Sequence, residues 1–230
     1  MDSIHHEGKE HMAGDSVKSK PVCYIFGAGQ PPACPPETGA GDLVVAADGG
    51  YAWTQAAGIR TDVVIGDFDS LGHVPELSGD GPVVVSLPAE KDETDTLAAL
   101  RYGLERGFRC FHIYGGTGGR LDHTVANIQC LVYLAVRGAR GYLHDRDTVL
   151  TAFGGEILLA ARLHGTISVF ALGGPAEGVW LRGLKYELEN AVLTPDFPLG
   201  GSNAFTGQPA SIKSERGVLL VVYPAGTQEL

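Results

Sequence analysis

Two aspartates directly follow a short apolar run, and their spacing has the clearest chemical meaning in this sequence. Asp67 and Asp69 flank Phe68 and come after residues 63–65, which read Val-Val-Ile. In an extended chain, the side chains of residues two apart project the same way. Two carboxylates placed like this repel each other unless a cation lies between them, and hard oxygen ligands favour Mg²⁺. A solvated acidic turn without a ligand would give the same pattern.

A second acidic group opens a predicted helix further along the chain. Asp92 is expected to be the N-cap and Asp95 to occupy N3, as in a variant of the capping box. Acidic residues in a first helical turn complement the helix dipole and need no ligand, so capping is the simpler interpretation. Lys91 and Thr94 would add an ammonium group and a hydroxyl that can contact phosphate.

A glycine-rich segment, residues 115–119, precedes Arg120, Asp122 and His123. Glycines let backbone N–H groups approach phosphate oxygens closely, and an arginine stabilises charge on a transferring phosphoryl group. A flexible turn with a surface arginine and a helix-capping Asp122 is the alternative interpretation.

Two other turns follow apolar runs. Asp48 begins an Asp-Gly-Gly turn, which either helps to bind a nucleotide or is a turn alone. Gly27 and Gly29 form either a turn close to a nucleotide or an ordinary tight turn. The sequence has no G-x-x-x-x-G-K-[ST] phosphate loop and no G-x-S-x-G elbow.

The elements that must position these residues alternate between strand and helix. Near-continuous apolar runs predict strands that are covered on both faces. Helical periodicity predicts one helix that ends at Gly107 and another over about residues 122–137. This alternation indicates a parallel sheet with right-handed crossovers, whose carboxyl edge is where ligands bind. The predicted strands are residues 22–26, 43–47, 63–65, 83–85 and 110–114.

The pattern changes near residue 141, beyond which short strands recur between glycine-rich turns. This arrangement is typical of a β-sandwich or small barrel. We therefore predict a disordered tail at 1–20, a Rossmann-like, doubly wound α/β domain at 21–140 and an all-β sandwich at 141–230. Trp180 and Tyr186 either stack on an aromatic ligand or lie in the core of the second domain, and the core is the expected place. The short strands are predicted at residues 148–151, 157–159, 166–170, 178–181 and 218–222.

Composition limits the class of partner and the compartment. The chain has 44% hydrophobic residues and a formal net charge of −10, which argues against a nucleic-acid or anionic-membrane surface. The four cysteines form no C-x-x-C pair, and no apolar stretch reaches eighteen residues. The polar N-terminus lacks the apolar region of a signal peptide. These features predict a reduced, cytoplasmic protein.

Taken together, the motifs resemble those of the thiamine pyrophosphokinase family in order and spacing. The resemblance covers about residues 22–223. It implies transfer of a pyrophosphoryl group from ATP to the thiamine hydroxyl, with Mg²⁺ as cofactor and AMP as the second product. It also implies a homodimer with active sites between subunits. The segments that carry the resemblance are residues 48–50, 66–70, 91–95, 118–123, 183–186 and 202–205.

The resemblance also implies a role for each matching residue. Asp67, Asp69 and Asp95 resemble the carboxylates that handle metal and phosphate, and Arg120 and Asp122 belong with them in the catalytic set. Ser202 and Asn203 resemble thiamine-side residues. Asp122 or another carboxylate would accept the hydroxyl proton, and that base is unassigned. The residues that resemble a nucleotide site are Asp48, Lys91, Asp92, Thr94, Arg120 and Asp122.

Two other functions are compatible with parts of the pattern. A Mg²⁺-dependent phosphatase could use Asp67 as nucleophile and Asp69 as acid and base, but it would not need the glycine-arginine segment. A non-catalytic sensor of thiamine or nucleotide would gain support from broken carboxylates, and these are intact.

Overall fold

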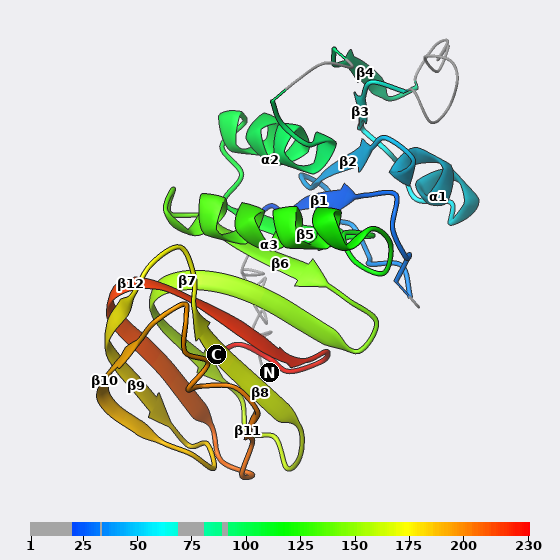
Figure 1. The fold of residues 1–230 in the computed structure, drawn as a ribbon. Coiled ribbons are helices and arrows are strands. Elements are labelled where there is room, and N and C mark those ends of the chain that lie inside the picture. The colour runs from blue at the N-terminus through cyan, green and yellow to red at the C-terminus, as the bar shows by residue number, and fades with distance from the viewer. Residues whose placement is uncertain (1–19, 33, 69–80, 89–91) are drawn as a thin grey trace, which may run out of the picture.

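The computed structural model describes residues 20–32, 34–68, 81–88 and 92–230. Most strands belong to one mixed sheet that runs through the molecule in the order β10-β9-β12-β7-β6-β5-β1-β2-β3-β4 (Figure 1). One part of this sheet is parallel and carries the helices, and the other part is antiparallel. Among the described residues, no helix is long and apolar enough to cross a membrane.

The parallel part contains six strands in the order β6-β5-β1-β2-β3-β4. β1 pairs with β2 on one side and with β5 on the other, so the connections reverse direction between β1 and β5. This is a topological switch point, where open α/β sheets bind ligands. The strands are β1 (Cys23–Phe26), β2 (Leu43–Ala47), β3 (Val63–Gly66), β4 (Val83–Ser86), β5 (Cys110–Tyr114) and β6 (Arg140–His144).

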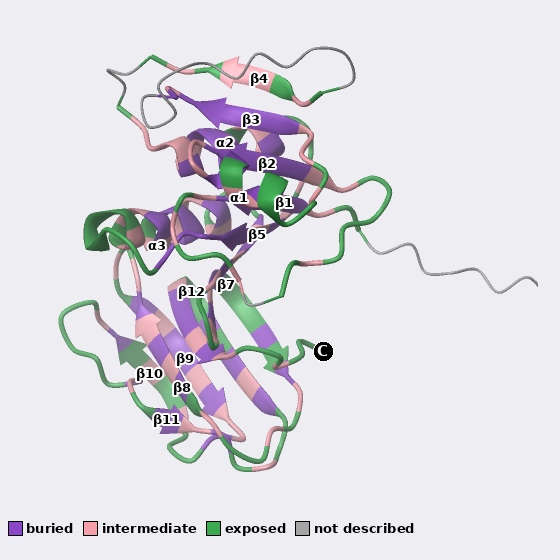
Figure 2. Ribbon diagram, turned by 90° about the vertical axis from the view of Figure 1, so that its right-hand side faces the viewer, coloured by how far each residue is buried: buried purple, intermediate pink, exposed green. Residues whose placement is uncertain are grey.

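Burial follows the position of each strand in the sheet. Figure 2 shows β3 and β2 mainly buried, while β4 at the edge is partly exposed. The five predicted strands are confirmed, but the expectation that all are covered on both faces is wrong for β4, where Val83 is 57% exposed. β6 was not predicted, because its sequence Arg-Gly-Tyr-Leu-His has no continuous apolar run.

Helices cover both faces of the parallel part. α2 (Asp95–Glu105) and α3 (Leu121–Ala135) pack on the face that carries Ile25 and Ile113. α1 (Gly50–Ala56) packs on the other face through Tyr51 and Trp53. The sequence did not predict α1, because it has seven residues, no side-chain N-cap and no acidic first turn.

The predicted capping of α2 is wrong in detail. The N-cap is Thr94, whose hydroxyl accepts a hydrogen bond from the N–H of Leu97 at 3.3 Å. Asp95 is therefore the first helical residue, and Asp92 lies in the turn before the helix. This later start of α2 places the Thr94 hydroxyl and the Asp95 carboxylate together at the beginning of the helix.

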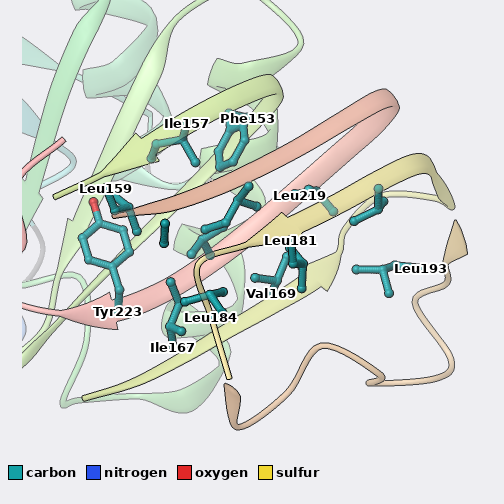
Figure 3. Packing of buried hydrophobic residues seen from close by; sticks show 14 of the residues in the cluster. Phe153, Ile157, Leu159, Ile167, Val169, Leu181, Leu184, Leu193, Leu219 and Tyr223 are labelled. Atoms are coloured by element: carbon teal, nitrogen blue, oxygen red, sulfur yellow. The ribbon is translucent and has the colours of Figure 1, made fainter. Parts of the chain in front are cut away.

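The antiparallel half is organised around one long strand, β12. This strand pairs with β7 along most of its length, with β9 near its start and with β8 near its end. The resulting layers enclose a core that includes Phe153, Val169, Leu181 and Leu219 (Figure 3). The strands are β7 (Thr148–Leu159), β8 (Thr166–Ala171), β9 (Ala176–Arg182), β10 (Leu188–Leu193), β11 (Asn203–Ala204) and β12 (Ala210–Pro224).

The two halves share the sheet. Gly141 of β6 pairs with Ala152 of β7, so the parallel part continues directly into the antiparallel part. The predicted boundary between residues 140 and 141 falls inside β6. Residues 148–151 and 157–159, predicted as two strands, form the single strand β7, because Gly154 and Gly155 continue the strand instead of turning.

A row of aromatic and histidine rings lines the sheet face opposite α2 and α3. His112 Nδ1 lies 2.8 Å from His144 Nε2, and one of these nitrogens donates to the other. Tyr114 stacks on His144 with ring centroids 4.3 Å apart. Burial lowers the pKa of His112 to about 4, although Asp42 opposes this shift. Burial and the nearby His112 lower the pKa of His144 to about 3.

These two histidines should make stability depend on pH. Unfolded histidine has a pKa of about 6.5, so below this value the unfolded chain binds protons that the folded chain does not. The free energy of unfolding should therefore fall as pH decreases from about 6.5 to about 4. The slope is at most about 1.4 kcal/mol per pH unit for each histidine.

Chemical denaturation between pH 7 and pH 5 measures the slope of the unfolding free energy against pH, and His144→Phe should reduce this slope. An equal slope in that variant would contradict the assignment.

Candidate active site

A pocket of about 500 Å³ opens at the carboxyl ends of β1 and β5, at the switch point of the sheet. The segments that follow β1, β2 and β5 and the first turns of α2 and α3 line it. Four of the residues expected to act together line this one pocket: Asp48, Thr94, Asp95 and Arg120. Asp69 and Lys91, also expected there, lie outside the described residues.

The floor of the pocket is made by two chain segments that touch backbone to backbone. The N–H of Gly27 donates to the carbonyl of Tyr114, and the N–H of Gly29 donates to that of Gly115, both at 2.8 Å. A Cβ atom on Gly29 would overlap the carbonyl oxygens of Gly115 and Thr117. The glycines after β1 are therefore required for this contact, which neither of the two sequence interpretations anticipated.

The glycine-rich segment presents hydrogen-bond donors to the pocket. Within the described residues, the backbone N–H groups of Gly116, Thr117, Gly118 and Gly119 donate no hydrogen bond. The adjoining helix α3 has Arg120 as N-cap, with no side-chain cap. Unpaired N–H groups on a glycine-rich turn and at a helix N-terminus form an anion-binding site. The expected phosphate contact at this segment therefore has a structural basis.

Arg120 and Asp122 form an ion pair at the rim of this site. Arg120 Nη2 lies 2.6 Å from Asp122 Oδ2, and the two side chains are 72% and 62% exposed. The hydrogen bond from the guanidinium lowers the pKa of Asp122. An exposed pair contributes little to stability, so Arg120 can exchange this partner for a phosphate.

The carboxylates come from the neighbouring strand exits. The N–H of Asp48 donates to the carbonyl of Ile65 at 2.8 Å, and a Cβ atom on Gly66 would lie 3.2 Å from Cα of Asp48. Asp48 therefore lies beside the segment that carries Asp67. Asp95 reaches the same pocket from α2.

The turn that carries Asp67 is not extended. Phe68 has φ 59° and is 2% exposed, packed with Ala46, Tyr51 and Val64. The expected extended chain is therefore interrupted at Phe68, and Asp69 lies outside the described residues. A left-handed conformation is costly for a bulky residue and persists only where the surrounding structure enforces it. Burial of the Phe68 ring supplies that constraint.

The donor chemistry suits Mg²⁺, although the described residues alone do not enclose an ion. Within them, no three His, Cys, Asp or Glu side chains converge as a metal site. Mg²⁺ is usually bound by one or two carboxylates together with substrate phosphates and water. Asp48 and Asp95 line the pocket beside the anion-binding segment, and Asp67 follows β3 next to Asp48.

Comparison with known proteins identifies the family to which this fold and site correspond. Residues 38–143 match the thiamin pyrophosphokinase catalytic domain, and residues 156–219 match the thiamin pyrophosphokinase vitamin B1 binding domain. The chain belongs to the thiamin pyrophosphokinase family. The resemblance inferred from the motifs is thereby confirmed.

Individual members of the thiamin pyrophosphokinase family agree in sequence and fold. Thiamine pyrophosphokinase of Bacillus subtilis (strain 168) is 28% identical over 184 residues, which cover 78% of this chain and 86% of that protein. A crystal structure of thiamine pyrophosphokinase from Bacillus subtilis has a TM-score of 0.76 at 25% identity and covers 88% of this chain and 98% of its own. The thiamin pyrophosphokinase structure from Geobacillus thermodenitrificans has a TM-score of 0.73 at 27% identity, with coverage of 89% and 97%.

The two residues expected on the thiamine side lie elsewhere. Ser202 directly precedes β11 and Asn203 is its first residue, at the end of the antiparallel half away from the pocket (Figure 1). Asn203 is 3% exposed, and its amide bonds the backbone N–H and carbonyl of Tyr186 at 2.9 and 2.6 Å. Tyr186 itself is 58% exposed, so its expected place in the core is wrong. Asn203 thus positions the exposed Tyr186.

Several pocket residues were missed by sequence reasoning. Thr96 and Thr124 occupy the first turns of α2 and α3, beside residues that were predicted. His123, which the sequence places at the start of a helix, lines the pocket as well. Asn127 is 5% exposed and lies on the same helix stripe as Leu131 and Leu134. An amide within an apolar stripe is the signal that could have identified it, because a buried amide requires a hydrogen-bond partner.

The backbone contact beneath the pocket predicts the effect of one methyl group. Gly29→Ala should lower the free energy of unfolding by about 1–3 kcal/mol, because the methyl group overlaps backbone that cannot repack. It should also weaken ATP binding. Gly174→Ala is the matched control, since a Cβ atom there meets nothing within 4 Å. Denaturation and ATP titration of both variants measure these effects, and equal behaviour of the two would contradict this account of the floor.

Proposed function

We propose that this protein transfers the pyrophosphoryl group of ATP to the hydroxyl of thiamine, giving thiamine diphosphate and AMP. The observation that carries the proposal is the anion-binding segment Gly116–Gly119, which meets Arg120 and aspartates at the switch point of a thiamin pyrophosphokinase fold. Phosphoryl transfer needs positioning and charge stabilisation more than covalent help, and these groups provide both.

In the proposed reaction, the thiamine hydroxyl oxygen attacks the β-phosphorus of ATP. The new oxygen–phosphorus bond forms as the bond between the β-phosphorus and the oxygen of AMP breaks, so AMP leaves with that electron pair. The N–H groups of Gly116–Gly119 hold the phosphate oxygens, and Arg120 stabilises the charge that develops on them. The hydroxyl proton passes to Asp122 or to another carboxylate.

The proposed cofactor is Mg²⁺, held by Asp67 and Asp69 with Asp95. When bound, it supplies positive charge to the phosphate oxygens. Asp48, Lys91, Asp92 and Thr94 complete the proposed nucleotide site. Among these, Asp92 is exposed and does not line the pocket, so its proposed contact depends on nucleotide that extends beyond the pocket.

We further propose the two-domain description expected from the sequence: a Rossmann-like α/β domain followed by a β-sandwich. Support comes from helices on both faces of the parallel part and from the layered strands around β12. A cytoplasmic location is part of the proposal and is supported by four free cysteines. Neither the phosphatase nor the sensor alternative gains support from the comparisons, whose matching domains are those of a pyrophosphokinase.

A homodimer is proposed because, within a single chain, the residues proposed to bind thiamine lie far from the phosphate pocket. Ser202 and Asn203 do not line the phosphate pocket, and β11 lies at the far end of the antiparallel half. The neighbouring Tyr186, Phe197 and Leu199 are 58%, 63% and 49% exposed. Clustered exposed apolar side chains mark interaction surfaces. A second copy that covers this surface would bring its thiamine-side residues to the pocket of the first.

The reaction products test the proposed chemistry. Protein incubated with ATP, Mg²⁺ and thiamine should form AMP and thiamine diphosphate in equal amounts. Asp67→Asn should lower turnover by roughly a hundredfold or more, because a preorganised charge that serves the reacting phosphate is lost. Chromatography of the nucleotides and thiamine esters measures both effects. Formation of ADP or free phosphate without thiamine diphosphate would refute the proposal.

Co-expression of two inactive variants tests the shared site. Asp67→Asn damages the phosphate side and Asn203→Ala the thiamine side, so each homodimer should be inactive. Mixed dimers would keep one intact site of two, and random pairing should restore about a quarter of wild-type activity. Native mass spectrometry counts the mixed dimers. Their presence without recovered activity, or full activity of a wild-type monomer, would rule out a site shared between chains.

A further inference from the structure

The glycine-rich segment is fixed by two side-chain contacts besides its backbone contact with the exit of β1. We propose that Asn127 and the pair Thr117–Asp145 are positioning residues, which orient the peptide groups of this segment so that their N–H groups bind the phosphates of ATP. This inference rests on the proposed function, because it assigns the segment to ATP.

Asn127 reaches the glycine-rich segment from α3 and binds it at Gly116. Its Nδ2 donates to the carbonyl of Gly116 at 2.9 Å, and the residue is 5% exposed. The segment passes so close to the helix that a Cβ atom on Gly116 would lie 3.1 Å from Asn127 Nδ2 and 2.6 Å from Leu143. A buried amide is favourable only when it is hydrogen-bonded. The bond to Gly116 is therefore the physical reason for an amide on an otherwise apolar helix stripe.

Thr117 is held from the opposite side by the turn after β6. Its hydroxyl donates to Asp145 Oδ1 at 2.6 Å. Asp145 is itself fixed, because its N–H donates to the carbonyl of Thr148 at 3.0 Å. The carbonyl of Thr117 accepts from the N–H of Gln30 at 3.1 Å, so its hydroxyl and its carbonyl are both engaged while its N–H stays available.

Together these contacts engage a continuous row of carbonyl groups in the segment. The carbonyls of the four consecutive residues from Tyr114 to Thr117 all accept hydrogen bonds from the scaffold: from Gly27, Gly29, Asn127 and Gln30 in turn. In a planar trans peptide the N–H points opposite to the C=O. The N–H groups of the following residues, Gly116, Thr117 and Gly118, therefore point away from the scaffold. Because Gly116 and Thr117 line the pocket, we infer that these N–H groups are available to a phosphate bound in it.

The contact of Asn127 decides the orientation of the peptide between Gly116 and Thr117. Glycine permits backbone conformations that other residues avoid, so this peptide can rotate if its carbonyl loses its partner. A rotated peptide would present an oxygen to the phosphate in place of an N–H. Removal of the amide should therefore weaken ATP binding out of proportion to its effect on folding, and it should leave thiamine binding unchanged.

The test measures Mg²⁺-ATP binding by calorimetry in the absence of thiamine, together with KM for each substrate. Asn127→Leu keeps the side-chain volume but removes the donor. We expect Kd for ATP to rise by about tenfold or more, kcat to fall, and KM for thiamine to stay within about twofold, as expected when the bond lost orients only the phosphate site. Thr117→Val, which is isosteric, should raise Kd for ATP in the same direction.

The matched control is Thr151→Val. The Thr151 hydroxyl donates to the carbonyl of Gly141 at 2.8 Å, and the residue is fully buried away from the pocket. This variant loses a comparable buried bond to a glycine carbonyl, so its melting temperature should fall while its Kd for ATP stays at the wild-type value. An equal rise of Kd in this control would show that general destabilisation explains the effect and would overturn the inference.

Two further outcomes separate the inference from the proposed function. If wild-type protein binds ATP and folded Asn127→Leu or Thr117→Val binds it equally well, the positioning role is wrong and the proposed function stands. If wild-type protein binds no ATP, the proposed function fails and the inference falls with it. Should Asn127→Leu not fold, Thr117→Val alone decides, because its valine changes no volume and leaves the α3 core untouched.

Discussion

The structure depends on the contact between the chain segments that leave β1 and β5. These strands are neighbours at the point where the sheet reverses its connections, so their exits meet. Only glycine allows the two backbones to approach this closely, as the overlaps of a Cβ atom on Gly29 or Gly115 demonstrate. The contact occupies the carbonyl groups of Tyr114, Gly115 and Thr117 and leaves the N–H groups of the glycine-rich segment for a ligand. A structural requirement of the fold thus creates the electrostatic character of the site.

The opposite edge of the parallel sheet shows the complementary pattern. There α2 and α3 end, and Lys20, Arg109 and Arg140 line a second cavity of about 630 Å³. Arg109 Nη1 donates to the carbonyls of Leu104 and Phe108 at 3.2 and 2.7 Å. Cations are favourable at helix C-termini, whose carbonyls carry partial negative charge. The C-terminus of α2 therefore accounts for Arg109 at this edge, just as helix starts contribute to anion binding at the other.

Sequence reasoning succeeded where one local signal was sufficient. Strands β1, β2, β3 and β5 are apolar runs because they are buried. The acidic and glycine residues at the strand exits can be located from the sequence because they directly follow these runs. It failed where the decisive contact joins distant segments. Asn127 and Gly116 are eleven positions apart, and Thr117 and Asp145 twenty-eight. The short helix α1 was missed because its stability comes from the packing of Tyr51 and Trp53 against the sheet, and it has no side-chain N-cap that would indicate a helix start in the sequence.

Backbone strain connects the phosphate side to the thiamine side. Among the described residues, four other than glycine have left-handed backbones: Asp48, Phe68, Asn190 and Ser202. Three of them lie in motifs that the sequence had already singled out for chemistry. Such conformations cost about 1–3 kcal/mol each and concentrate at functional sites. Ser202 shares this property although it lies far from the phosphate pocket within one chain. Left-handed backbone at both places agrees with the proposal that both segments belong to a functional site.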